Sequence, residues 1–205
     1  MIVVAATGLV DPDAWRRLWE TDRMELTIAA VTTAGVVLVG VLEAIVFAAG
    51  LSIVDVVRRS ARPHDAVLGW VDRLGRWGDV AVHRSARLTP GVVVYRLDDR
   101  LFFANQSYVR ARVREAVRGA PSETRAVVLD AEGLADVDIA GLGALDDIQS
   151  RLAGEGIALH VARMKTPVTE KLEDAGVAER IGRERFHPTV RAAVSAAVRD
   201  LVPAV

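Results

Sequence analysis

A long apolar run near the amino terminus limits what this chain can fold into. Residues 26–54 read LTIAAVTTAGVVLVGVLEAIVFAAGLSIV, and Glu43 is the only ionisable residue among them. About 18 or more consecutive apolar residues are typical of a transmembrane helix. We therefore expect this segment to lie in a lipid bilayer. The alternative is a buried core helix of a soluble protein.

Glu43 lies near the middle of the run and argues against a single straight span. A carboxylate at the bilayer centre costs about 3 kcal/mol on insertion scales. A break between Gly40 and Glu43 gives two short helices of roughly 15 residues, each about 22 Å long at the α-helical rise. Arginines flank both ends of the run, and the positive-inside rule then places both flanks in the cytoplasm. The alternative role for Glu43 is that of a functional acid within the membrane.

The predicted hairpin divides the amino-terminal part of the chain into two segments. Two short transmembrane helices are expected over residues 26–58. Residues 1–25 are interpreted as the end of a membrane helix followed by an amphipathic linker at the membrane interface, because Trp15 and Trp19 lie one helical turn apart beside Arg16 and Arg17.

After Pro63 the sequence predicts an α/β fold with a mostly parallel sheet. Strand-like runs alternate with amphipathic helical stretches, which is typical of parallel strands joined by helices. Asp98 and Asp99 are expected to form the tight turn of a hairpin, and Asn105 is expected to cap the following helix. The expected strands are 92–97, 101–104, 126–130 and 157–162, with weaker candidates at 67–71 and 80–88; the expected helices are 106–118, one from about 139, 166–174 and 188–201.

Composition and residue spacing argue against several classes of function. The chain has no cysteine, which excludes disulfides and cysteine-ligated metal. Its 26 basic and 27 acidic residues alternate, so no nucleic-acid partner is expected. The four histidines are scattered, so no catalytic residue, metal site or cofactor is predicted, and the chain is not expected to be an enzyme. The acidic cluster is interpreted as solvated helix ends; it comprises Asp136, Asp138, Asp146 and Asp147.

Two motifs resemble the SulP anion transporters and their C-terminal STAS domain, named for sulphate transporters and anti-sigma factor antagonists. RSARPHDAVLG at 59–69 is similar to the membrane exit of these transporters, and PGVVVYRLDDRLFFANQSYV at 90–109 is the second specific piece. The resemblance covers nearly the whole chain. It implies that 26–57 are the last two membrane helices of a transporter and that 59–89 are a linker and the start of the cytoplasmic domain. Residues 90–202 are then a STAS-type sheet with flanking helices.

The resemblance also implies a function. The chain is expected to be the C-terminal fragment of a secondary active, multi-pass transporter of a sulphate-like inorganic anion in the plasma membrane, with a cytoplasmic STAS regulatory domain. Its expected partners are the lipid bilayer, the remaining membrane domain and a second copy in a homodimer. The family's substrate-binding helices precede this region, so the chain alone is not expected to transport. The alternative is a membrane-tethered STAS module, complete as it stands, that binds a partner protein or a nucleotide.

The loop Asp138, Ile139, Ala140 and Gly141 is the candidate site for binding an anion, a nucleotide or a partner protein. In the resembling family this loop usually carries an Asp, then Ser or Thr, then Gly, and a Ser there is phosphorylated in the antagonists. No hydroxyl remains here, so a phosphorylation switch is not expected. An acid, a glycine and unpaired amides at a helix start predict a site for an anion or nucleotide phosphate. The alternative is a helix start whose Asp138 caps backbone amides and whose Ile139 faces the core.

Overall fold

The computed structural model describes residues 19, 26–27, 30–31 and 40–201. The chain divides into two compact units, Met1–Arg58 and Arg59–Val205. The predicted interfacial segment 1–25 and the first helix of the predicted membrane hairpin fall mainly outside the described residues.

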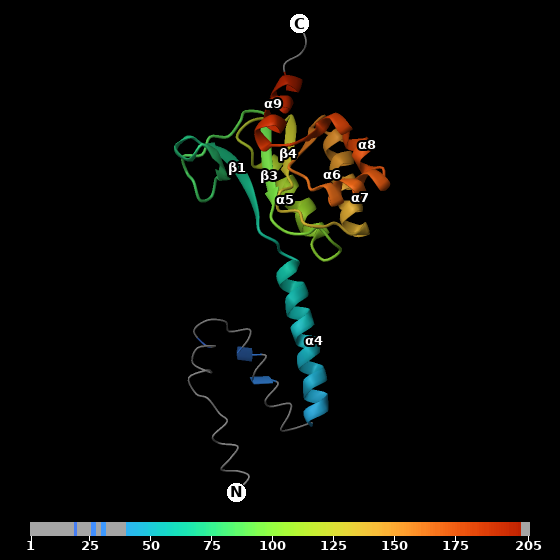
Figure 1. Ribbon diagram of the computed structural model, residues 1–205. Coiled ribbons are helices and arrows are strands. Elements are labelled where there is room, and N and C mark those ends of the chain that lie inside the picture. The colour runs from blue at the N-terminus through green and yellow to red at the C-terminus, as the bar shows by residue number, and fades with distance from the viewer. Residues whose placement is uncertain (1–18, 20–25, 28–29, 32–39, 202–205) are drawn as a thin grey trace. The chain divides into compact units, whose positions relative to one another are not determined.

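Helix α4, Val41–Ser60, begins where the sequence predicts the second helix of the hairpin (Figure 1). Gly40 precedes it with a φ of 140°, a backbone conformation that side chains with a Cβ rarely adopt. Glu43 lies exposed in the first turn of α4, near the positive end of the helix dipole. No helix within the described ranges combines the length and the apolarity needed to cross a membrane. The membrane hairpin is therefore not confirmed.

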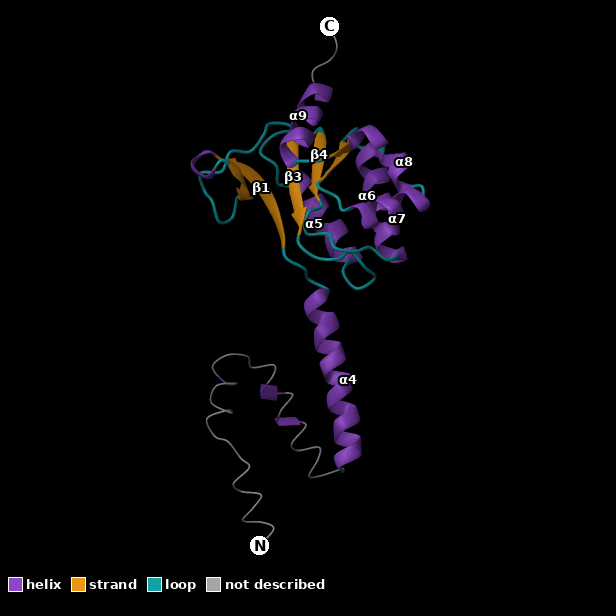
Figure 2. Ribbon diagram, viewed as in Figure 1, coloured by secondary structure: helices purple, strands orange, loops and turns teal. Residues whose placement is uncertain are grey.

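A six-stranded mixed sheet forms the centre of the second unit (Figure 2). The spatial order is β2-β1-β3-β4-β5-β6; β3 to β6 run parallel, and β1 is antiparallel to both β2 and β3. The strands are β1 Asp65–Val71, β2 Arg76–Asp79, β3 Val92–Leu97, β4 Ala126–Asp130, β5 Ala158–Ala162 and β6 Phe186–His187. The predicted α/β class with a mostly parallel sheet is confirmed, and the sheet takes in residues 65–79 of the segment 59–89.

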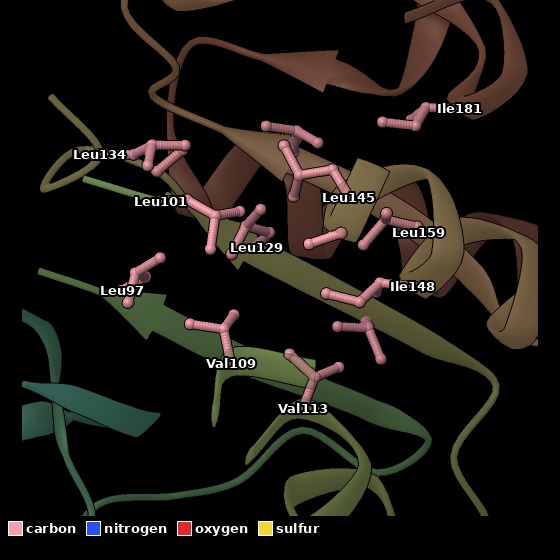
Figure 3. Close-up of a cluster of buried hydrophobic side chains, with 14 of the residues drawn as sticks. Leu97, Leu101, Val109, Val113, Leu129, Leu134, Leu145, Ile148, Leu159 and Ile181 are labelled. Carbon is pink, nitrogen blue, oxygen red and sulfur yellow. The ribbon is translucent and has the colours of Figure 1, made fainter. Parts of the chain in front are cut away.

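Helices cover the two faces of this sheet unequally (Figure 1). The helices are α5 Gln106–Arg118, α6 Ile139–Gly154, α7 Thr166–Asp174, α8 Val177–Ile181 and α9 Val190–Leu201, with 3-10 turns at Asp72–Leu74 and Arg183–Arg185. Successive side chains of a strand point to opposite faces. Val93 and Tyr95 therefore join a core with α5 to α8, whereas Val92 and Val94 pack against α9. Figure 3 shows part of the larger core, built from leucine, isoleucine and valine side chains.

The predicted hairpin between 92–97 and 101–104 is wrong. Leu101 forms an isolated parallel bridge with Val137, and the residues after it turn into α5. The antiparallel neighbour of β3 is β1, in which Leu68 lies opposite Val94. In place of the weakly predicted strand 80–88, the chain forms turns and an irregular loop, and Arg87 makes an isolated antiparallel bridge with Trp70.

Asn105 precedes α5 as predicted, but its side chain does not cap the helix. Its Oδ1 accepts a hydrogen bond from the Phe102 amide at 2.9 Å, and its Nδ2 donates to the Arg100 carbonyl at 2.8 Å. The side chain is fully buried, so it satisfies its polar atoms within the preceding turn. Asn105 thus fixes the loop between β3 and α5.

Candidate functional site

The predicted site residues lie at the amino end of α6, next to the loop that leads into α5. Asp138 is extended and stands at the N-cap of α6, where its Oδ1 accepts a hydrogen bond from the Gly141 amide at 2.7 Å. Its Oδ2 accepts from the Phe103 amide at 3.0 Å. One carboxylate therefore satisfies a donor of the first helical turn and joins two loops that are far apart in the sequence. The capping interpretation of Asp138 is confirmed.

Gly141 is buried at the closest approach of these two loops. A Cβ at this position would lie within 2.3 Å of the Leu101 carbonyl oxygen and 2.7 Å of Val137 Cγ2. The same carbonyl accepts a hydrogen bond from the Asp138 amide at 3.2 Å. The glycine is therefore required by backbone proximity, and this requirement holds whether or not the loop binds a ligand.

Ile139 does not face the core, so that part of the capping interpretation is wrong. Its side chain is 88% exposed. The core face of α6 carries Gly141, Ala144 and Leu145. Ile139 precedes Gly141 by two positions, which rotates it by about 200° to the opposite side of the helix. Phe103 is also exposed, so the loops joined by Asp138 present two apolar side chains to their surroundings.

The anion or nucleotide site at Asp138, Ile139, Ala140 and Gly141 stays a prediction. The amino end of α6 attracts negative charge through its free amides and its dipole. The carboxylate of Asp138 already lies there and supplies that charge. An incoming phosphate would meet both the occupied amide of Gly141 and the repulsion of this carboxylate.

The other members of the acidic cluster form ion pairs. Lys171 donates to Asp136 Oδ1 at 2.6 Å and also to the Val137 carbonyl. The hydrogen bond from Lys171 to Asp136 is the main cause that lowers the pKa of Asp136. Asp147 contacts both Arg110 and Arg151, while Asp146 pairs with Arg180. These acids bind neighbouring cationic side chains, and their own side chains remain 34–58% exposed to solvent.

Replacing Asp138 by Ala is expected to lower the free energy of unfolding of residues 59–205 by about 1–2 kcal/mol, the usual cost of losing an N-cap. Urea unfolding followed by the fluorescence of Trp70 and Trp77 measures it. Asp138→Asn is the matched control, because its remaining oxygen still caps Gly141 while its amide nitrogen cannot accept from Phe103. Equal losses for both variants would contradict the capping role.

A buried ion pair at the carboxyl end of the sheet was missed by the sequence analysis. Asp130 ends β4 and is fully buried, and Arg163 directly follows the neighbouring strand β5. Arg163 donates from Nε to Oδ1 at 3.0 Å and from Nη2 to Oδ2 at 2.6 Å, and its hydrogen bonding to Asp130 is the main cause that raises its pKa. The signal available in the sequence was the position of Asp130 and Arg163 at the carboxyl ends of two strands, because the carboxyl ends of adjacent parallel strands meet at one edge of the sheet.

A second polar network joins α5 to β1. Asp65 accepts a hydrogen bond from the Tyr108 hydroxyl at 2.9 Å and from Arg112 Nε at 2.8 Å. The Asp65 side chain is 5% exposed. Burial, followed by the contact with Asp65, raises the pKa of Tyr108. This network places Arg112 of α5 beside the antiparallel part of the sheet, and its residues were also missed.

His160 confirms the structural interpretation of a histidine within an apolar strand. Its ring is 1% exposed and lies on the α9 side of β5, with Nδ1 3.1 Å from Nε2 of His187. One ring must donate and the other accept, so a doubly protonated pair loses this hydrogen bond. Burial lowers the pKa of His160 and of His187, and Asp200 opposes both effects.

Acidification is expected to destabilise this pair. An unfolded histidine titrates near 6.5, above the lowered folded pKa values, so the unfolded chain binds more protons below that pH. Stability is therefore present above about pH 6.5 and is lost as the pH falls below it. Urea unfolding across this range should give a shallower pH dependence for His160→Gln. An unchanged slope in that variant would contradict the assignment.

The sheet order, the helix cover and the joined loops define a small mixed α/β domain. The family model of the STAS domain matches residues 83–193, which is more than half of the chain. The chain therefore belongs to the STAS domain family. The predicted STAS-type sheet with flanking helices is confirmed.

Similarity to curated proteins extends beyond the STAS domain. A protein named probable sulfate transporter, from Mycobacterium tuberculosis, is 38% identical over 196 residues, covering 96% of this chain and 35% of the relative. Low affinity sulfate transporter 3 of Stylosanthes hamata is 29% identical, covering 96% of this chain and 32% of that protein. The chain thus spans about a third of the length of these relatives. The match to their C-terminal part confirms the resemblance to SulP transporters.

Two solved structures show the same fold. The murine anion transporter Slc26a9 in its inward-facing state matches 94% of this chain with a TM-score of 0.82 and 20% identity, over 31% of that protein. A sulfate transporter family protein from Wolinella succinogenes matches 60% of this chain and 98% of its own length, with a TM-score of 0.50 and 18% identity.

Proposed function

We propose that this chain is the C-terminal part of a SulP-type transporter that moves a sulphate-like inorganic anion across the plasma membrane, with its STAS unit as the cytoplasmic regulatory domain. The observation that carries the proposal is the similarity of 96% of the chain to proteins named sulfate transporters in a bacterium and in plants. The similarity covers residues on both sides of the division between the two units.

The surface of α4 supports a membrane location for the first unit. Its large apolar side chains are 57–70% exposed at eight positions: Val41, Leu42, Ile45, Val46, Phe47, Ile53, Val54 and Val56. A contiguous apolar surface of this kind is stable against lipid or against other apolar helices. Arg58, Arg59 and Arg62 follow, and basic residues at a helix end favour the cytoplasmic side.

The proposed arrangement assigns partners to each part. The lipid bilayer and the remaining membrane domain of the transporter contact α4, and Glu43 at its first turn lies at the far interface. Residues 61–64 separate α4 from β1, so a displacement of the helix is transmitted to the sheet by a short connection. The STAS unit thereby regulates the membrane part, and a second copy and a nucleotide are further proposed partners.

A chimera tests this function. In the Mycobacterium tuberculosis relative, the aligned C-terminal region is replaced by this chain, and uptake of radiolabelled sulfate is measured in cells that lack their own uptake system. The proposal predicts saturable uptake by the chimera and none by the relative cut before the replaced region. A chimera that reaches the membrane in normal amount but takes up no sulfate, while the intact relative does, would contradict the proposal.

A further inference from the structure

A groove with a basic rim runs between α5 and α6 on the side of the helices away from the sheet. It encloses about 260 Å³. Four of its nine lining residues are arginines, and one, Glu155, is acidic. In a chain with a net charge of −1, this is a local concentration of positive charge.

The arginines form two rows. Arg110, Arg114 and Arg118 recur every four residues along α5 and therefore lie on one face of that helix, while Arg151 comes from α6. Arg110 and Arg151 share the carboxylate of Asp147. Arg114 and Arg118 are both exposed. Neither has a carboxylate partner within the part of the chain that the structure describes. Like charges four residues apart destabilise a helix, so an anionic neighbour would relieve a repulsion.

The floor of the groove is apolar. Val113, Ile148 and Leu152 belong to the main core, and Val117 packs against it. The same four side chains also line the groove. Val113, Ile148 and Leu152 are only 5–7% exposed, so an occupant would meet a narrow apolar line at the bottom of the groove, with guanidinium groups along its edges. Guanidinium groups bind carboxylates through two parallel hydrogen bonds, which favours arginine at such an edge.

We propose that this groove binds an acidic segment of a partner protein that carries apolar side chains at helical spacing. The recessed apolar floor favours a peptide over a lipid surface, because a bilayer would contact the protruding arginines and leave the floor empty. Nucleic acid is disfavoured, since no aromatic side chain lines the groove for base stacking. This binding role of the groove is separate from anion transport and concerns the chemistry of a regulatory partner. It is tested without any transport measurement.

The test uses the full 205-residue chain in phosphatidylcholine nanodiscs and a fluorescein-labelled 14-residue peptide. In this probe leucine recurs at positions i, i+3 and i+7, and glutamate fills the other positions. Fluorescence anisotropy gives its Kd, which we expect to be in the range of tens of micromolar at 50 mM salt. Two comparison peptides replace every glutamate by lysine or every leucine by serine, and both are expected to bind at least tenfold more weakly.

Matched variants locate the site. Arg114→Glu combined with Arg118→Glu is expected to weaken binding of the glutamate–leucine probe at least tenfold. Arg73→Glu combined with Arg84→Glu makes the same charge change at exposed positions outside the groove and should alter the Kd less than twofold. Thermal unfolding of each variant shows that the fold is intact. Arg114→Lys with Arg118→Lys keeps the charge but loses the paired hydrogen bonds, so it should weaken binding less than the charge reversal does.

Three results would overturn the inference. One is a Kd above 1 mM for the glutamate–leucine probe. Another is an equal loss in both charge-reversed variants, which would reflect net charge alone. The third is binding of the leucine-free peptide with the same Kd as the glutamate–leucine probe, or stronger competition by phosphatidylserine vesicles than by unlabelled probe. Either result would show that the groove binds any anionic surface.

Discussion

Replacing Arg163 by Met is expected to lower the free energy of unfolding of residues 59–205 by about 3 kcal/mol, at the lower end of the cost of breaking a buried ion pair. The loss is large because Asp130 is fully buried and would lose the guanidinium that pairs with it. The lower end applies because the Arg163 side chain is 31% exposed, which lets water reach the vacated position. Urea unfolding followed by Trp70 and Trp77 fluorescence measures the change.

The double variant Asp130→Leu with Arg163→Met separates the ion pair from general packing. Removing both charges leaves no buried carboxylate unpaired, since Glu132, which also pairs with Arg163, is 62% exposed, and buried pairs replaced by apolar residues are often close to neutral. We therefore expect the double variant to be more stable than Arg163→Met alone. Arg163 also holds a left-handed backbone with a φ of 60°, a conformation unfavourable for a residue with a Cβ. A double variant no more stable than the single one would contradict the pairing argument.

Gly141→Ala is expected to destabilise the same unit by about 2–3 kcal/mol, in the upper range for overpacking a tight site. The added Cβ would lie 2.3 Å from the Leu101 carbonyl oxygen, and a backbone atom cannot move aside as a flexible side chain can. The clash would separate the start of α6 from the loop before α5. The loss should appear as a lower urea midpoint with an unchanged m-value.

Gly143 provides the matched control two residues further along α6. A Cβ at Gly143 would meet nothing within 4 Å, so Gly143→Ala changes only the helix propensity. Alanine is favoured over glycine in a helix interior by about 0.8–1 kcal/mol, so this variant should be stabilised. Opposite signs for the two substitutions would support the contact, and equal destabilisation would show that Leu101 does not limit the space at Gly141.

Local signals in the sequence predict much of the fold. The strands Val92–Leu97 and Ala126–Asp130 follow from runs of β-branched residues, and the helix Gln106–Arg118 follows from its apolar spacing. Strand pairing is different, because it depends on contacts that are distant in the chain. The Asp98–Asp99 turn favoured a hairpin, yet β3 pairs with β1 instead. Strand β2, Arg76–Asp79, contains a glycine and few strand-forming residues, and therefore gave no signal.

At the candidate site, too, local contacts could be predicted from the sequence and long-range contacts could not. The bond from Asp138 to the Gly141 amide spans three residues and is the usual geometry of an N-cap, so it could be predicted. The bond to the Phe103 amide spans 35 residues and depends on the folded position of α6. The Asp130–Arg163 pair spans 33 residues and requires the order of the strands to be known. Glu43 lies at the start of α4, and its role stays a prediction.

Accessibility of single cysteines in membrane vesicles tests the proposed topology most directly. The chain has no cysteine, so each introduced one is its only thiol. A membrane-impermeant maleimide is added to sealed inside-out and right-side-out vesicles. We predict that Ser85→Cys in the STAS unit reacts only in inside-out vesicles, and that Phe47→Cys and Val54→Cys on α4 react in neither until detergent is added. Labelling of Phe47→Cys as fast as Ser85→Cys without detergent would contradict the account.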